Sequence, residues 1–102
     1  MSVTFFPQAR RDAIGIGRDL MAAAGRGVSA RFEAKLRQTT RRLERFPQLA
    51  ARSEWISNDY PELRVAQIED FRNYLLFYEP SDDGIRVIRV VHGAMNIEDL
   101  FD

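Results

Sequence analysis

Apolar residues recur at helical spacing through the first half of the chain, and this pattern predicts two consecutive helices. The first is expected over residues 9–24 and the second over residues 29–46. We expect Ser29 to cap the second helix and Gly25 and Gly27 to end the first, so that the pair forms a hairpin joined by Gly-Arg-Gly. The predicted buried stripes are Ala13, Ile16, Leu20 and Ala24 in the first helix and Phe32, Leu36, Leu43 and Phe46 in the second.

Two glycines, Gly15 and Gly17, interrupt the first predicted helix. Each costs about 1 kcal/mol relative to alanine, so we expect both to serve close packing against a sheet or a neighbouring helix. The Gly-Ile-Gly sequence is not a dinucleotide-binding fingerprint, because the third glycine would fall on Leu20. The chain also has no Gly-Lys-Ser or Gly-Lys-Thr sequence. Nucleotide binding is therefore not predicted.

The apolar pattern changes to near-alternation after residue 63, which predicts strands. Asp83-Gly84 is a favourable turn between the last two strands. We further expect Trp55 to cover an edge of the core and residues 96–101 to form a short helix. The predicted strands are residues 3–6, 63–70, 73–79 and 85–92.

Both faces of the last two predicted strands are apolar, which is typical of central strands. Successive side chains on a strand point to opposite faces, so parity assigns each residue to a face. In the strand at 73–79, Leu75 and Phe77 share one face and Tyr74, Leu76 and Tyr78 the other; in the strand at 85–92, Val87 and Val91 share one face and Ile88 and Val90 the other.

The predicted element order is β-α-α-β-β-β, within one domain spanning residues 1–102. Two consecutive helices cannot serve as the crossover of an alternating α/β fold, so we expect the helix pair to pack on one face of an antiparallel meander. The first strand then joins the sheet beside a later one. The predicted fold is therefore α+β, a two-helix hairpin on a small mixed, mostly antiparallel sheet.

Charge is divided unevenly between the halves of the chain. Residues 1–53 carry a net charge of +7 and residues 54–102 a net charge of −7, for a total of zero. Such asymmetry suggests an acidic or polyanionic partner for the basic half, although a solvated helix face of mixed charge is the alternative. Most cations of the second helix have no acid one turn away, apart from Arg37 with Glu33. Arg37, Arg41 and Arg45 follow one side of this helix, and Arg31, Lys35 and Arg42 another.

The composition leaves little room for nucleophilic or metal chemistry. The chain has no cysteine, which fits a reducing cytoplasm, and no apolar stretch long enough for a membrane span or a signal peptide. The single histidine, His92, has no obvious serine partner and no cluster of metal ligands. We expect no metal and no cofactor.

An arginine cluster on the sheet is the remaining candidate for chemistry. By parity, Arg86 shares the face of His92 and Arg89 points the other way. Depending on register, Arg64, Arg72 and Tyr78 lie near them, and such a cluster can bind phosphate or perform acid–base chemistry on RNA. The alternative is a structural rim of arginines paired with acids, with His92 as a hydrogen-bonded residue at the strand end.

The run NYLLFYEPSDDGIRVIRVVHGAMNIEDLF (residues 73–101) resembles the C-terminal signature of the ParE/RelE toxin superfamily, on the ParE side. The shared features are a Tyr-rich strand, an acidic-Gly turn, an Ile/Val strand ending in Val-X-His-Gly-Ala, and a short terminal helix. Upstream, the Ala-rich first helix, the basic second helix, Leu43 with Pro47, and Leu63-Arg64 follow a similar order. The resemblance is strong in residues 63–101 and loose in residues 1–60.

The resemblance implies the toxin of a bacterial type II toxin–antitoxin system that acts on DNA gyrase. It also implies a ParD-like antitoxin with a ribbon-helix-helix end and an acidic, amphipathic segment that wraps the toxin. That segment would bind the basic helices at Arg31, Lys35, Arg37, Arg41, Arg42 and Arg45. Arg86, Arg89 and His92 would then contact the target.

One departure from the family pattern concerns the residues after His-Gly-Ala. The family usually has Arg followed by an acid there, whereas this chain has Met95-Asn96 and an acidic, apolar end. RelE-type relatives cleave mRNA on the ribosome, and the missing cation removes a donor for a cyclising phosphate. A non-enzymatic gyrase inhibitor is therefore favoured. The alternatives are a ribosome-dependent RNase using Arg64, Arg72, Arg86 and His92, or an attenuated homologue that only binds antitoxin.

Overall fold

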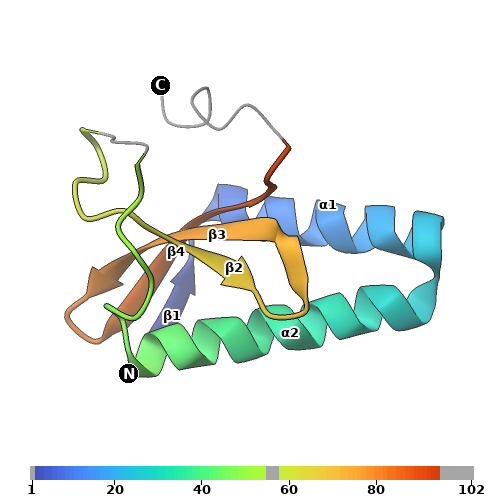
Figure 1. Cartoon of the computed structure of the whole chain (residues 1–102), viewed down its shortest axis with the longest axis horizontal. Helices are drawn as coiled ribbons and strands as arrows, with labels where there is room; N and C mark the ends of the chain where they lie inside the picture. Colours follow the sequence, from blue (N-terminus) through green and yellow to red (C-terminus); the bar gives the residue numbers. More distant parts are fainter. Residues whose placement is uncertain (1, 55–57, 95–102) are drawn as a thin grey trace.

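The computed structural model describes residues 2–54 and 58–94. Its elements follow the predicted order and form the predicted α+β fold (Figure 1). Trp55, Met95 and the helix predicted at residues 96–101 lie outside the described residues. The elements are β1 (Ser2–Phe5), α1 (Pro7–Ala24), α2 (Arg26–Arg45), β2 (Arg64–Ile68), β3 (Phe71–Ser81) and β4 (Gly84–His92).

The four strands form one mixed sheet in the order β1-β4-β3-β2. The β2–β3 and β3–β4 pairs are antiparallel, whereas β1 runs parallel to β4, so the sheet is mixed as predicted. Gly84 permits the close approach of β1 to the start of β4, because a Cβ atom there would lie 1.8 Å from the Ser2 carbonyl oxygen. Its φ of +155° also disfavours any residue with a side chain.

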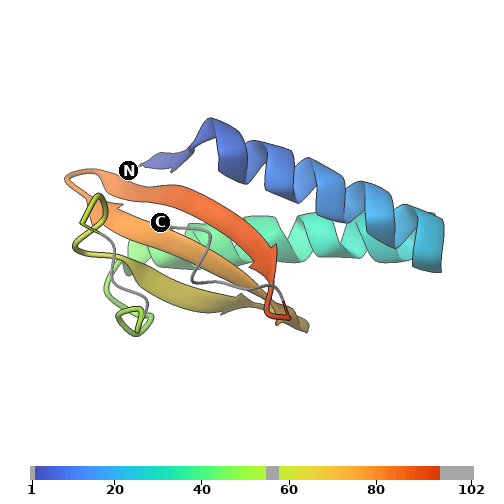
Figure 2. The same cartoon turned by 90° about the horizontal axis from the view of Figure 1, so that it is seen from above.

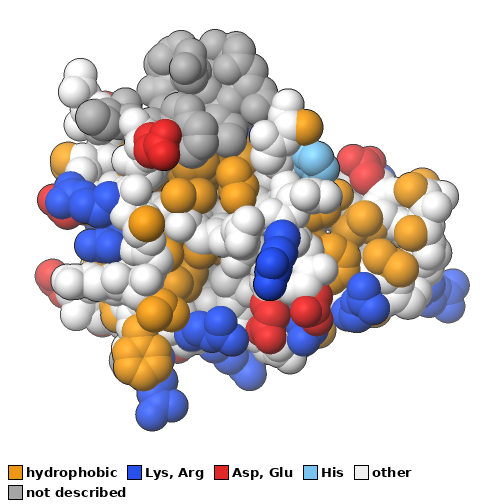
Figure 3. Space-filling view, viewed as in Figure 1, with side chains coloured by type: hydrophobic (Ala, Val, Ile, Leu, Met, Phe, Trp, Pro, Cys, Tyr) orange, Lys and Arg blue, Asp and Glu red, His pale blue; other side chains and the backbone are white. Residues whose placement is uncertain are grey.

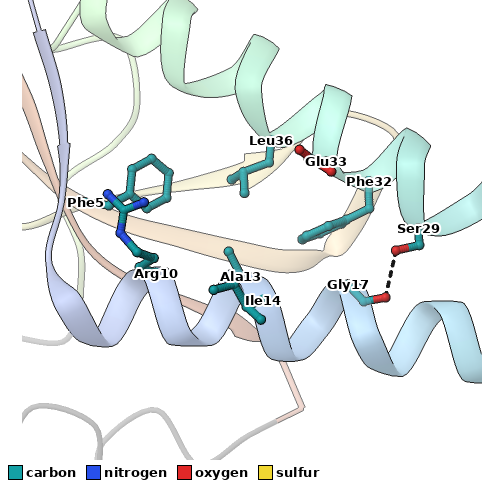
Figure 4. Close-up of a pocket in the computed structure, with 9 residues that line it drawn as sticks. All are labelled: Phe5, Arg10, Ala13, Ile14, Gly17, Ser29, Phe32, Glu33 and Leu36. Carbon is teal, nitrogen blue, oxygen red and sulfur yellow. Dashed lines mark hydrogen bonds between the residues drawn. The ribbon is translucent and has the colours of Figure 1, made fainter.

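The turn between the helices is shorter than predicted. Gly25 alone, with φ of 95°, reverses the chain, and α2 begins at the next residue. Ser29 is therefore not the cap. It is the fourth residue of α2, and its hydroxyl donates a 2.7 Å hydrogen bond to the Gly17 carbonyl oxygen (Figure 4). Gly27 lies inside α2 and does not end α1.

The helices cover one face of the sheet, and their hairpin continues beyond it (Figures 1 and 2). The main core lies between the two layers, and a smaller cluster lies on the other face of the sheet. Tyr74, Leu76 and Tyr78 belong to the main core and Leu75 and Phe77 to the smaller cluster, so the faces predicted for β3 are confirmed. Among the described residues, no helix is both long and apolar enough to cross a membrane.

A β-bulge in β4 changes which residues share a face. Phe77 lies opposite Arg89, whereas the next residue, Tyr78, lies opposite Val87, so Ile88 is an extra residue in β4. Val87 and Val90 therefore both belong to the main core, and Ile88 and Val91 to the smaller cluster. The predicted grouping for β4 was wrong because strict alternation does not anticipate an inserted residue.

Candidate partner-binding groove and the basic helix

An apolar groove lies between α1 and α2 (Figure 4). Figure 4 shows Phe32 and Leu36 projecting from α2, with Ala13 on α1 facing them. Phe32 and Leu36 are buried and form part of the core, so the groove is a continuation of the core to the surface. Its volume is about 440 Å³, and it is lined by Phe5, Arg10, Ala13, Ile14, Gly17, Ser29, Phe32, Glu33 and Leu36.

The walls of the groove are fixed by contacts at its base. The Ser29–Gly17 hydrogen bond joins the two helices, and a Cβ atom on Gly17 would lie 3.6 Å from the Ser29 hydroxyl. Gly17 therefore contacts the neighbouring helix, but 3.6 Å is an ordinary van der Waals distance, so the packing does not require a glycine here. The Phe32 ring makes edge contacts with Phe71 and Tyr74, each with 5.3 Å between ring centroids. The groove is consequently preformed.

Arg10 and Glu33 bring opposite charges to the two walls of the groove. Glu33 accepts a 3.2 Å hydrogen bond from Arg37, the pair predicted from the sequence. Arg10 is exposed, and its guanidinium has no ion pair within residues 2–54 and 58–94. The groove therefore has an uncompensated cation beside its apolar lining.

Two of the six predicted antitoxin-binding cations are paired with acids outside α2. Lys35 Nζ lies 3.1 Å from Asp70 Oδ2, and Arg42 Nη2 lies 3.4 Å from Glu69 Oε2. These acids form the β2–β3 turn, so the ion pairs join α2 to the sheet. On the same side of the helix, the Arg31 guanidinium lies 5.4 Å from the centre of the Phe71 ring.

The other three cations, Arg37, Arg41 and Arg45, are exposed to solvent. Arg45 lies over the Phe46 ring at 5.6 Å, and Arg41 has no ion pair in the described part of the chain. Figure 3 shows blue side chains gathered along the edge of the molecule where α2 runs. A stripe of cations therefore follows α2 from Arg37 to Arg45, over about two and a half turns.

Arg64 and Tyr78 lie directly opposite each other on β2 and β3 and hold a loop in place. Arg64 Nη1 donates a 2.6 Å hydrogen bond to the Ala50 carbonyl, and the Tyr78 hydroxyl donates a 2.8 Å hydrogen bond to the Pro47 carbonyl. Burial raises the pKa of Tyr78 above its ordinary value of 10.0, and the nearby Arg64 charge partly opposes this rise. The geometry is that of a structural clamp.

Arg86 and His92 lie on opposite faces of the sheet, contrary to the prediction. Arg86 lies opposite Glu79, and its guanidinium is 3.4 Å from that carboxylate. His92 lies opposite Tyr74, with 5.0 Å between ring centroids, on the side of the helices. The bulge at Ile88 reverses the parity between them. His92 Nδ1 accepts a 3.0 Å hydrogen bond from the Ala94 N–H, which agrees with the structural reading of this histidine.

The four residues of the RNase alternative do not converge on one site. Arg72 lines a hollow beside α2 with Arg42 and Glu69, Arg64 clamps the 47–50 loop, and Arg86 and His92 lie on opposite faces. Among the described residues, no group of His, Asp and Glu is suited to hold a metal ion.

Arg89, which was predicted to contact the target, is instead paired inside the molecule. Its Nε and Nη2 atoms donate hydrogen bonds of 2.7 and 3.1 Å to Asp12, which also accepts one of 3.1 Å from the Val90 N–H. The exposed fractions of the two side chains are 18% for Arg89 and 9% for Asp12. Asp12 was not among the predicted site residues. Its position on α1, three residues after Ala9 and four before Ile16, is a signal, because it places an acid on the apolar face.

Residues 3–97 match the family model described as "ParE toxin of type II toxin-antitoxin system, parDE". The chain therefore belongs to the ParE toxin family of type II toxin–antitoxin systems. A solved structure described as "Chromosomal ParDE TA system from P. aeruginosa" has the same fold, with a TM-score of 0.72 and 18% sequence identity. That match covers 90% of this chain and 95% of the other. Comparison with curated protein sequences gives no match.

Proposed function

We propose that this chain is a toxin that inhibits DNA gyrase by binding it, and that an antitoxin segment neutralises it by binding the groove and the basic side of α2. The observation that carries the proposal is the preformed apolar groove with the uncompensated Arg10 on its wall. Membership of the ParE toxin family supports the toxin role. The cytoplasm is the expected location, because gyrase acts there.

The groove suits an amphipathic helix that places apolar side chains between α1 and α2. Acidic residues on the same helix would then approach Arg10 at the groove and Arg37, Arg41 and Arg45 along α2. A carboxylate near several arginines gains charge-assisted hydrogen bonds without requiring a unique geometry. An acidic, amphipathic segment, as expected of a ParD-like antitoxin, has this chemistry.

The proposal assigns no catalytic role to the sheet. The arginines and the histidine needed for RNA cleavage are dispersed, so no phosphate position is surrounded by them. Of the three predicted target contacts, Arg89 is paired with Asp12, and Arg86 and His92 face opposite directions. One flat target surface cannot use all three. Arg86, on the sheet face away from the helices, stays in the proposal as a target contact.

The purified chain should inhibit gyrase supercoiling, and the protein encoded by the neighbouring reading frame should relieve that inhibition. Ile14→Asp should weaken antitoxin binding by about 100-fold, because Ile14 lines the groove and a buried isoleucine contributes about 2 kcal/mol or more. The control is Met21→Asp on the same helix. Met21 has similar exposure, 51% against 56% for Ile14, but does not line the groove. Calorimetric titration measures both affinities.

Two results would contradict the proposal separately. Unaffected supercoiling by the wild-type chain would refute gyrase as the target. Equal loss of antitoxin affinity in Ile14→Asp and Met21→Asp, or loss in neither, would refute the groove as the binding site. Gyrase inhibition by Ile14→Asp should remain at the wild-type level when no antitoxin is present.

A further inference from the structure

A second apolar surface lies at the C-terminal end of α2, away from the groove. Phe46 and Leu49 have exposed fractions of 54% and 59%, and they lie beside Pro80 at the end of β3. Figure 3 shows apolar side chains protruding at this end of the molecule. We call this surface the end patch. It is a hollow of about 540 Å³ lined by Arg45, Phe46, Pro47, Gln48, Leu49, Pro80 and Ser81, and none of these residues lines the groove.

The loop that carries the end patch is held rigidly by side chains of β2 and β3. The Tyr78 hydroxyl and the Arg64 guanidinium bind the carbonyls of Pro47 and Ala50, and the Leu49 N–H donates a 3.0 Å hydrogen bond to the Phe46 carbonyl. The loop therefore holds its apolar side chains toward solvent. A rigid apolar surface loses little conformational entropy when a partner covers it.

The charges beside the end patch decide what could cover it. Arg45 lies on one wall, with its guanidinium over the Phe46 ring. The other wall ends at Ser81, which is followed by the exposed Asp82 in the β3–β4 turn. Within the described residues, Asp82 makes no ion pair. The surface thus carries a cation at one side, an apolar centre, and an anion at the other side.

A uniformly acidic or basic partner would be repelled by one of these two charges. A partner with an apolar centre and the same two charges in reverse order would match both, and a second copy of this chain rotated by a twofold axis presents that arrangement. We propose that the end patch is a twofold self-association surface, in which Arg45 of each copy faces Asp82 of the other. The patch is small, so the dissociation constant should be on the order of 100 µM.

Sedimentation velocity of the full chain, without antitoxin, tests the apolar centre. From about 5 µM to about 1 mM, the wild-type sedimentation coefficient should rise from the monomer value toward that of a dimer. Phe46→Ser combined with Leu49→Ser should remain monomeric throughout. The matched control is Ile14→Ser combined with Met21→Ser, which removes two residues of similar exposure elsewhere and should associate like the wild type.

Charge reversal tests whether the partner is a second copy of this chain, paired through Arg45 and Asp82. Arg45→Asp alone and Asp82→Arg alone should each weaken association at least tenfold, whereas the two together should restore it. Arg18→Asp, on the exposed side of α1, should change nothing. The proposal is overturned if the wild type stays monomeric at the highest concentration, if the serine pair still associates, or if the double reversal fails to restore association. Gyrase and antitoxin take no part in these measurements, so their outcome is separate from that of the proposed function.

Discussion

Asp12 connects α1 to the part of β4 that β1 does not reach. β1 pairs with β4 only as far as Val87, and Asp12 accepts a hydrogen bond from the Val90 N–H, three residues further along β4. It also neutralises Arg89 beside it. One carboxylate therefore accepts a hydrogen bond from a backbone N–H of β4 and neutralises a largely buried cation.

Removing this carboxylate should destabilise the protein strongly. Asp12→Ala leaves Arg89 largely buried without a counter-charge, and we expect a loss of about 3 kcal/mol in the free energy of unfolding. Asp19→Ala is the control, because Asp19 is an exposed acid on the same helix, and its effect should stay within about 0.5 kcal/mol. Urea unfolding measures both. Similar values for the two variants would show that the Arg89–Asp12 pair is not important for stability.

Tyr78 should make stability sensitive to alkaline pH. Burial raises the pKa of Tyr78 in the folded state above the unfolded value of 10.0, so unfolding releases a proton once the pH exceeds about 10. The contribution of Tyr78 is therefore fully present below pH 10 and is lost as the pH rises through the folded-state pKa. Tyr78→Phe should cost about 1 kcal/mol near neutrality, from the lost hydrogen bond to Pro47.

The Tyr78→Phe variant should also lose less stability than the wild type between about pH 9 and pH 11. Urea unfolding at several pH values compares the two slopes. Parallel curves would show that Tyr78 ionisation does not contribute to alkaline destabilisation.

At the level of elements, α1 carries a glycine that its packing does not require. A Cβ atom on Gly15 would meet nothing within 4 Å, so the predicted close packing at this position was wrong. Gly15→Ala should therefore stabilise the protein by about 1 kcal/mol, which for a domain of this size raises Tm by about 4–8 °C.

Gly84→Ala is the opposite case and serves as the comparison. The new Cβ atom would collide with the Ser2 backbone, and the positive φ adds strain, so Tm should fall sharply. Calorimetry of both variants measures the two shifts. A fall in Tm for Gly15→Ala would mean that the helix needs this glycine for another reason.

The sequence predicted each helix and strand because their apolar periods are long and regular. It did not predict two local features. Gly25 alone was enough to turn the chain, so α2 starts three residues before the expected cap. The extra residue Ile88 in β4 has no signature in an apolar run, since Val and Ile satisfy either face equally well. That single residue places Arg86 and His92 on opposite faces of the sheet, so the predicted arginine–histidine cluster does not form.

At the scale of the whole molecule, the basic and acidic halves neutralise each other only in part. Glu69 and Asp70 of the acidic half form ion pairs with Arg42 and Lys35 on α2. The stripe from Arg37 to Arg45 stays exposed to solvent. The basic helix could be predicted from sequence because its charges are local. The groove could not, because Phe5, Arg10 and Phe32 come together only through tertiary packing.

Reversing Arg37, Arg41 and Arg45 to Glu should weaken antitoxin binding and flatten its dependence on salt, because the lost contacts are screened charges. The control reverses Arg11, Arg18 and Arg26, three exposed arginines on α1 and at the start of α2, for the same change in net charge. Titrations at two salt concentrations, with the toxin well below about 1 µM, keep self-association out of the measurement. Unchanged affinity at low salt would place the interface elsewhere.

The bulge in β4 determines how relatives of this chain can be compared with it. A relative whose strand has the same number of residues but lacks the bulge would keep strict alternation, and its histidine would emerge on the opposite side of the sheet. Two homologues that both read Val-His-Gly can thus expose the imidazole in opposite directions. Mutational results at this histidine are transferable between two homologues only when both strands contain the bulge or both lack it.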